Sequence, residues 1–205
     1  MIVDAVPVSD FIQTNAYFYI DEQTKHGFLI DPGAEAEKLL QIIRKNDWII
    51  EKILITHGHF DHIGGVEKIH RELNIPYFTH KNGQKYLTDG NYNLSAFFIN
   101  EIILNEAQYL DEGDEIVLEA DPKVKLRVIY TPGHTQDAVI YYDADNKLAF
   151  VGDTIFKNSV GRTDIPGGDE KQLYKSIREK IFTLPDDTVL YSGHSEPTTV
   201  GAEKP

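Results

Sequence analysis

The sequence has 205 residues, enough for one sizeable hydrophobic core, and no linker rich in proline, glycine or serine divides it, so a single domain over residues 1–205 is expected. Twenty Lys and Arg against 33 Asp and Glu give a formal net charge of −13, which disfavours nucleic acid and anionic membranes as partners. The absence of cysteine excludes disulfides, a thiol nucleophile and thiolate-bound metal.

The N-terminal segment has no signal-peptide pattern, and no apolar run approaches the ~18 residues of a membrane span. A cytoplasmic protein is therefore expected, and the sequence does not indicate its oligomeric state.

The first part of the chain reads as strands followed by a helix and a further strand. Aromatic and β-branched residues favour the strands, and apolar residues at helical spacing favour the helix. Asp31 ends one strand before a Pro32-Gly33 turn, where it either orients a metal-binding imidazole or caps the next helix. The predicted strands are Ile2 to Val8, Ala16 to Ile20, His26 to Asp31 and Lys52 to Thr56, and the helix is Ala34 to Asn46.

A dense group of metal-competent side chains follows the last of these strands, in the run I-L-I-T-H-G-H-F-D-H-I-G-G from Ile53 to Gly65. His57, His59, Asp61 and His62 are nitrogen and oxygen donors that suit zinc, iron or manganese. The alternative is a polar loop that is rich in histidine by chance, but the length and order of the motif disfavour it. The sequence predicts a metal centre here.

The middle of the chain is less regular. Ile63 to Leu73 is predicted to be a helix that carries His70, and His80 is expected in a loop. Both histidines are predicted to be solvated surface residues rather than ligands. Residues 83–110, with a possible short helix and an apolar patch at Phe97 to Leu104, are expected to be irregular and to supply substrate contacts.

Three strands in the second half end in the same way, with glycine followed by one metal-competent side chain: His134, Asp153 and His194. Glycine there lets the backbone approach a crowded centre closely. Five imidazoles and two carboxylates are too many for one tetrahedral ion and match two ions that share a carboxylate. The predicted strands are Glu115 to Leu118, Val124 to Tyr130, Ala138 to Tyr142, Leu148 to Val151 and Thr188 to Tyr191, and the helix is Glu170 to Leu184.

With these motifs the sequence resembles the metallo-β-lactamase superfamily, and within it the short glyoxalase II-like hydrolases. The resemblance implies an α/β fold, a four-layer αβ/βα sandwich of two mixed sheets flanked by helices. It also implies two divalent metal ions, zinc first with iron or manganese as alternatives. By position, His57, His59 and His134 would hold one ion, Asp61, His62 and His194 the other, and Asp153 would bridge them.

The resemblance also implies hydrolysis of a small acyl thioester such as S-D-lactoylglutathione, with Asp61 and Asp153 orienting the attacking water. The commonest β-lactamases carry a cysteine where this chain has Asp153, which disfavours that activity. Arg162 either grips a substrate carboxylate or pairs with Asp164. Thr163 and Asp164 stand where glyoxalase II has aromatic residues, and no glutathione-binding helical extension follows His194, so discrimination for glutathione is expected to be poor.

Two other functions stay open at this point. A mononuclear iron persulfide dioxygenase would use His57, His134 and Asp153 as a two-histidine, one-carboxylate set, with the other four donors around it. A non-catalytic metal-binding module is disfavoured because all seven ligand positions of the family pattern are filled.

Overall fold

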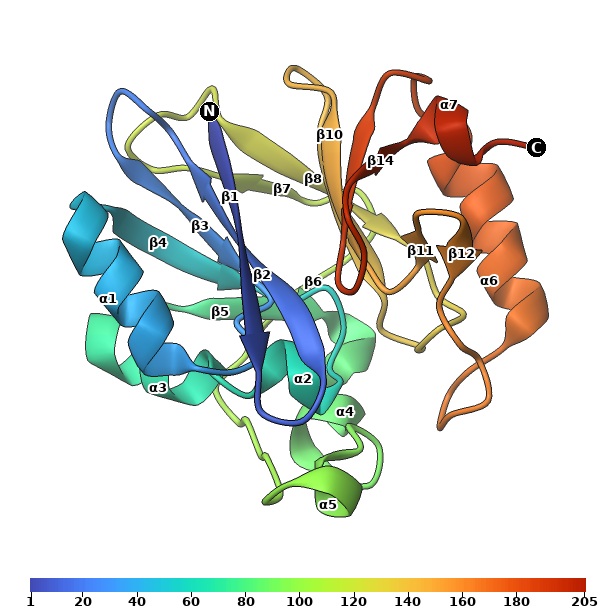
Figure 1. Ribbon diagram of the computed structural model, residues 1–205, viewed down its shortest axis with the longest axis horizontal. Coiled ribbons are helices and arrows are strands. Elements are labelled where there is room, and N and C mark those ends of the chain that lie inside the picture. The colour runs from blue at the N-terminus through green and yellow to red at the C-terminus, as the bar shows by residue number, and fades with distance from the viewer.

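A computed structural model describes residues 1–205 and shows two six-stranded sheets with helices on their outer faces (Figure 1). The α/β fold with two mixed sheets is confirmed. The first sheet has the order β1-β2-β3-β4-β5-β6, with antiparallel pairing from β1 to β3 and parallel pairing from β3 to β6. Its strands are Ile2–Ser9, Gln13–Ile20, His26–Ile30, Ile49–Leu54, Tyr77–His80 and Gln108–Leu110.

The second sheet has the order β14-β13-β10-β9-β8-β7, and only the β10–β13 pair is parallel. A separate hairpin pairs β11 (Ile155–Phe156) with β12 (Ser159–Val160). The strands of the second sheet in chain order are β7 (Glu115–Val117), β8 (Lys125–Tyr130), β9 (Val139–Asp143), β10 (Leu148–Gly152), β13 (Val189–Ser192) and β14 (Thr198–Thr199).

The helices are short. A 3₁₀ turn at Lys81–Gly83 precedes α4, and α6 continues as a π-helical turn at Ile177–Ile181. The helices are α1 (Ala36–Asn46), α2 (Phe60–Ile63), α3 (Val66–Leu73), α4 (Gln84–Thr88), α5 (Ser95–Phe98), α6 (Glu170–Ser176) and α7 (Val200–Glu203). None of them is both long and apolar enough to cross a membrane.

Side chains of β2 point alternately to the two faces of the first sheet, and each face packs into a different core. Ala16, Phe18 and Ile20 point to a core shared with α1 and α3, which also holds Leu40 and Ile69. Tyr17 and Tyr19 point the other way, into the core between the two sheets. A third core lies between the second sheet and α6, where Leu173 and Ile177 meet Ile140 and Val151. The order of layers is therefore helix, sheet, sheet, helix.

The predicted strands and long helices are present, with shifts of a few residues at their ends. The strand before the histidine loop covers Ile49–Leu54 rather than Lys52 to Thr56, so Ile55 and Thr56 already belong to the loop. The predicted helix from Ile63 is two pieces, α2 and α3, separated at Gly64-Gly65. Strands β5 and β6 were not predicted, because three or four residues give too little pattern.

Candidate metal centre

Seven donor side chains meet at the strand ends where the two sheets come together. The first sheet supplies those that follow β4, in the loop and in α2, and the second sheet supplies those that follow β8, β10 and β13. The structure thus brings together every predicted donor: His57, His59, Asp61, His62, His134, Asp153 and His194.

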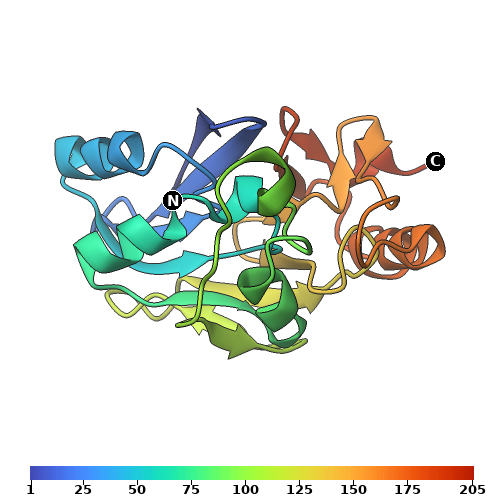
Figure 2. The ribbon, with the colours of Figure 1, turned by 90° about the horizontal axis from the view of Figure 1, so that it is seen from below.

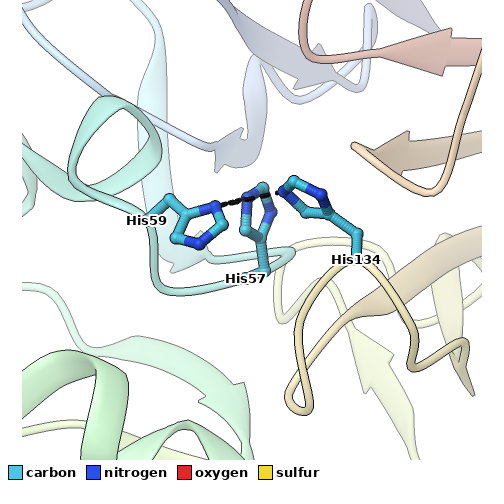
Figure 3. A group of neighbouring side chains, drawn as sticks. All are labelled: His57, His59 and His134. Atoms are coloured by element: carbon cyan, nitrogen blue, oxygen red, sulfur yellow. Dashed lines mark hydrogen bonds between the residues drawn. The ribbon is translucent and has the colours of Figure 1, made fainter. Parts of the chain in front are cut away.

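The first donor group consists of three imidazoles whose nitrogens point toward one another (Figure 3). The Nδ1 atom of His59 lies 3.0 Å from Nε2 of His57 and 3.1 Å from Nε2 of His134. One proton on His59 cannot satisfy both of these neighbours well, and lone pairs that face one another repel. All three rings are buried, so water cannot relieve this repulsion. A cation bound among the three nitrogens would remove this repulsion.

The second group combines imidazoles with carboxylates. Nε2 of His194 lies 3.2 Å from Oδ2 of Asp61 and 3.1 Å from Oδ2 of Asp153. Nε2 of His62 lies 3.3 Å from Oδ1 of Asp153, and Oδ2 of Asp153 lies 3.6 Å from Nε2 of His134. Asp153 therefore reaches both groups, as a bridging ligand must. Buried Nε2 of His62 and Oδ1 of Asp153 have no hydrogen-bond partner, which also fits a bound cation.

Asp31 fixes the orientation of two of these imidazoles. Its Oδ2 accepts hydrogen bonds from His62 Nδ1 at 2.8 Å and from the Thr56 hydroxyl at 2.6 Å, and its Oδ1 accepts from the Thr56 backbone N–H. The Thr56 hydroxyl in turn accepts from His57 Nδ1 at 3.2 Å. Protons on the Nδ1 atoms leave the Nε2 lone pairs directed at the centre. Asp31 is thus the orienting partner, and the helix-cap alternative is wrong because Glu35 occupies the N-cap of α1.

Three further donors, His134, His194 and Asp61, also have a hydrogen-bond partner outside the centre. His134 Nδ1 donates to the carbonyl of Arg162 at 2.7 Å, and His194 Nδ1 donates to the carbonyl of Gln13 at 2.8 Å. The Thr14 hydroxyl donates to Oδ2 of Asp61 at 2.8 Å. The start of β2 and the segment after β12 therefore hold side chains of the centre in place. Sequence reasoning did not find these partners, because two of them are backbone carbonyls.

The electrostatics of the centre favour positive charge beside its carboxylates. Burial and the neighbouring imidazoles lower the pKa of His59 to about 3, and burial together with His62 lowers the pKa of His57. Burial also acts on His62, but the carboxylates of Asp153, Asp31 and Asp61 outweigh it and raise its pKa. The first group is therefore neutral and free to donate lone pairs, whereas the second holds carboxylates that attract a cation.

Two glycines allow the close packing around the centre that the strand-end pattern predicts. Gly152 has a φ of +50°, and a Cβ there would lie 2.4 Å from the Thr56 hydroxyl oxygen. A Cβ on Gly193 would lie 2.4 Å from Oδ1 of Asp153. Larger residues at either position would displace groups that form the centre.

His70 and His80 lie outside the donor groups, but the prediction that both are solvated surface residues is wrong. His70 is half-buried, and its Nδ1 donates to the carbonyl of Ile75. His80 is buried at the end of β5, stacked on Tyr130 at 4.1 Å between ring centroids. Its Nδ1 accepts from the backbone N–H of Asn82. The unpredicted strand β5 is the reason that His80 is inside the protein.

A cavity of about 670 Å³ opens beside the donors. His59, Asp61, His134, Asp153 and His194 lie on its inner side, and most of the remaining wall is apolar. Residues 83–110, for which substrate contacts are expected, line the cavity through Leu94, Phe97 and Phe98. Arg162 also lines the cavity, and its guanidinium pairs with both oxygens of Asp164, at 2.7 and 2.8 Å. The other wall residues are Ile12, Phe60, Phe156, Val160 and Ile165.

Comparison with known proteins agrees with this architecture. Residues 9–194 match the family model described as the metallo-beta-lactamase superfamily. A probable metallo-hydrolase of Bacillus subtilis, YqgX, is 39% identical over 195 residues, which cover 94% of this chain and 90% of that protein. Hydroxyacylglutathione hydrolase GloC of Haemophilus influenzae is 32% identical over 213 residues, covering 100% of this chain and 95% of GloC.

Two crystal structures are similar over nearly the whole chain. BLEG-1, described as a B3 metallo-beta-lactamase, has a TM-score of 0.92 and 34% identity, and the match covers 98% of this chain and 96% of BLEG-1. TTHA1623 in a di-iron-bound form has a TM-score of 0.85 and 32% identity, with the same coverage of 98% and 96%.

Proposed function

This chain belongs to the metallo-β-lactamase superfamily, and from that premise we propose that it is a dinuclear metal-dependent hydrolase of acyl thioesters. The observation that carries the proposal is the gathering of seven donors beside a largely apolar cavity, with Asp153 within 3.1 to 3.6 Å of His62, His134 and His194. In this proposal His57, His59 and His134 hold one ion, Asp61, His62 and His194 hold the other, and Asp153 bridges them. Zinc is the first candidate, and the di-iron form of TTHA1623 keeps iron as an alternative.

When bound, the two ions supply Lewis acidity and bring the pKa of water toward neutrality. The residues of the chain supply orientation. Asp61, fixed by the Thr14 hydroxyl, and Asp153 would accept hydrogen bonds from the attacking water and aim its lone pair into the cavity. The apolar wall excludes bulk water from the acyl group, which strengthens the electrostatic interactions at the reacting carbon.

The leaving group favours a thioester. A thiol has a pKa of about 8.5, so it departs as a thiolate near neutral pH without a proton donor, whereas an amine needs one. Among the side chains that line the cavity, only Arg162 and the proposed metal-binding histidines carry N–H groups. The named activity of GloC also supports a thioester substrate.

The similarity to BLEG-1 brings a second candidate, hydrolysis of a β-lactam amide. Its reaction would need a proton for the leaving nitrogen, and the cavity offers no clear donor for it. The two candidates are separated by assaying a chromogenic cephalosporin and a thioester with the same metal-loaded protein.

The test combines metal content with turnover. Protein purified without added metal should carry close to two equivalents by elemental analysis and should release thiol from an acyl thioester. Because the chain has no cysteine, every thiol that a colorimetric reagent detects comes from the substrate. One equivalent of iron, together with oxygen uptake on glutathione persulfide and no ester hydrolysis, would instead identify a persulfide dioxygenase.

A further inference from the structure

The cavity beside the donors has two apolar walls, and the one arginine that lines it is paired with Asp164. From this composition we infer that the site, if it is the thioester hydrolase proposed above, takes thioesters whose acyl chain and thiol are both uncharged and apolar, rather than thioesters of glutathione. The inference concerns the walls of the cavity and not the metal chemistry, so the two can fail separately.

The first wall comes from the β1–β2 turn, α2 and α5, which lie close together in Figure 2. Phe98 joins them: its ring lies 5.0 Å from that of Phe11 and stacks on that of Phe60 at 5.4 Å. The backbone N–H of Phe60 donates to the carbonyl of Asn93, which ties the α5 segment to the histidine loop. The apolar wall is thus fixed next to the donors.

This wall leaves large apolar side chains open to solvent. Phe97 is 65% exposed, Phe98 43% and Ile12 39%, and all three line the cavity. Such a cluster beside a binding site is expected to be covered by an apolar ligand, because covering it removes apolar surface from water. The second wall, on the far side of the donors, is formed by Phe156 and Val160 of the β11–β12 hairpin together with Ile165. A thioester carbon at the donors would therefore have apolar surface on both sides.

The charges argue against glutathione, which brings two carboxylates and one ammonium. Arg162 is the only Lys or Arg that lines the cavity, and Asp164 already occupies its guanidinium with two hydrogen bonds. Lys157, beside Phe156 of the second wall, pairs with Glu196 at 2.7 Å. Carboxylates of glutathione would have to compete with Asp164 and Glu196 for these two cations, and the net charge of −13 repels an anionic substrate.

The first experiment uses metal-loaded protein and two series of thioesters. Lengthening the acyl group from acetyl to hexanoyl on one small neutral thiol, N-acetylcysteamine, should raise kcat/KM at least tenfold, since a buried methylene contributes about threefold. Exchanging that thiol for glutathione at constant acyl group should lower kcat/KM or leave it unchanged. Hydrolysis that does not depend on chain length, or that is at least tenfold faster for the glutathione ester, would overturn the inference while leaving thioester hydrolysis established.

Variants then assign the effect to the walls. Phe97→Ser should lower kcat/KM for the hexanoyl ester at least threefold more than for the acetyl ester, and because this ring is mostly exposed the variant should fold normally. Tyr109→Ser is the matched control, since Tyr109 is 48% exposed on the edge strand β6 and does not line the cavity. Asp164→Ala should release Arg162 and raise relative kcat/KM for the glutathione ester. Equal effects of Phe97→Ser and Tyr109→Ser would contradict the assignment.

Binding gives a readout that does not depend on turnover. The thioethers S-hexyl-N-acetylcysteamine and S-hexylglutathione cannot be hydrolysed, and calorimetric titration should show that the glutathione head gives no gain in affinity. The two binding titrations test the apolar specificity even if the protein hydrolyses no thioester, a result that would refute the proposed function alone. A tenfold gain from the glutathione head, or hexyl binding unaffected by Phe97→Ser, would refute the apolar specificity. So would a change in oligomeric state caused by Phe97→Ser without any change in binding, because the patch would then be an interface between chains.

Discussion

Replacing Asp31 with Asn should weaken binding of the second metal ion while the fold is retained. Asp31 has a left-handed φ of 48°, which asparagine tolerates better than most residues. The amide oxygen can still accept the backbone N–H of Thr56. The amide nitrogen, however, is only a donor and can accept neither from His62 Nδ1 nor from the Thr56 hydroxyl, whereas the carboxylate Oδ2 accepts from both, at 2.8 and 2.6 Å. His62 is then expected to carry its proton on Nε2, the atom that faces Asp153.

Loss of an outer hydrogen-bond partner of this kind weakens metal affinity by about 10- to 100-fold, or roughly 1.4–2.7 kcal/mol. The assay is metal content by elemental analysis after dialysis against a graded series of free zinc. The unaltered protein should hold two equivalents where Asp31→Asn holds about one. The same shift should appear as a higher zinc concentration for half-maximal thioester hydrolysis.

Asp143→Asn is the matched control. Asp143 is also a buried carboxylate and accepts from the Tyr19 hydroxyl at 2.6 Å, but it lies at the end of β9 that points away from the centre. The Asp143→Asn variant should be less stable than the unaltered protein but should bind metal as tightly. Unchanged zinc affinity in Asp31→Asn would refute the orienting role, and equal metal loss in both variants would mean that neutralising any buried carboxylate loosens the centre.

Four further predictions concern activity, stability and pH. Asp153→Ala should lower kcat by roughly a thousandfold or more, with a modest change in the free energy of unfolding. His80→Ala should instead lower the free energy of unfolding by about 1–3 kcal/mol and leave the metal content unchanged. Urea unfolding and elemental analysis check both variants. Removing the metal with a chelator should lower the melting temperature, but the far-ultraviolet circular dichroism spectrum should remain that of a folded protein, because the three apolar cores do not depend on the metal. Burial raises the pKa of Asp137 to about 7, above the unfolded value near 3.9, so its stabilising effect is present at acid pH and is lost as the pH rises through 7. Relative to Asp137→Asn, the free energy of unfolding of the unaltered protein should fall by roughly 1.4 kcal/mol per pH unit from pH 5 to 7. Parallel curves of unfolding free energy against pH for the two proteins would contradict this.

The sequence was most informative where many residues repeat one pattern. The alternation in β2 and the helical spacing in α1 are long enough to be recognised, and both elements are present. Strands β5 and β6 are only four and three residues long and gain their stability from parallel neighbours distant in the chain. That stability is tertiary, so no local signal predicts them, and the environment of His80 was predicted wrongly for the same reason.

The donors were predictable because four of them are packed into one loop after an apolar run and the other three each follow a glycine at the end of a strand. Their partners were not, since the carbonyls of Gln13 and Arg162 carry no side-chain signal. For Asp31 the residues allowed two roles, and only the 2.8 Å contact with His62 decides between them. The aromatic wall was foreseen as an irregular segment near the substrate, but its closeness to the β1–β2 turn depends on packing across the fold.

The division of donors between the two sheets has a consequence for how the protein matures. Each proposed ion takes ligands from both halves of the chain, between positions 57 and 194, and His194 reaches the centre only after β13 has joined β10. A nascent chain that still lacks β13 therefore cannot complete the coordination sphere of the second ion, which needs His194. Binding of the second ion is thus expected to be a late event that acts on an already folded protein. Once bound, the ions hold the halves together, so they should slow unfolding far more than they accelerate folding.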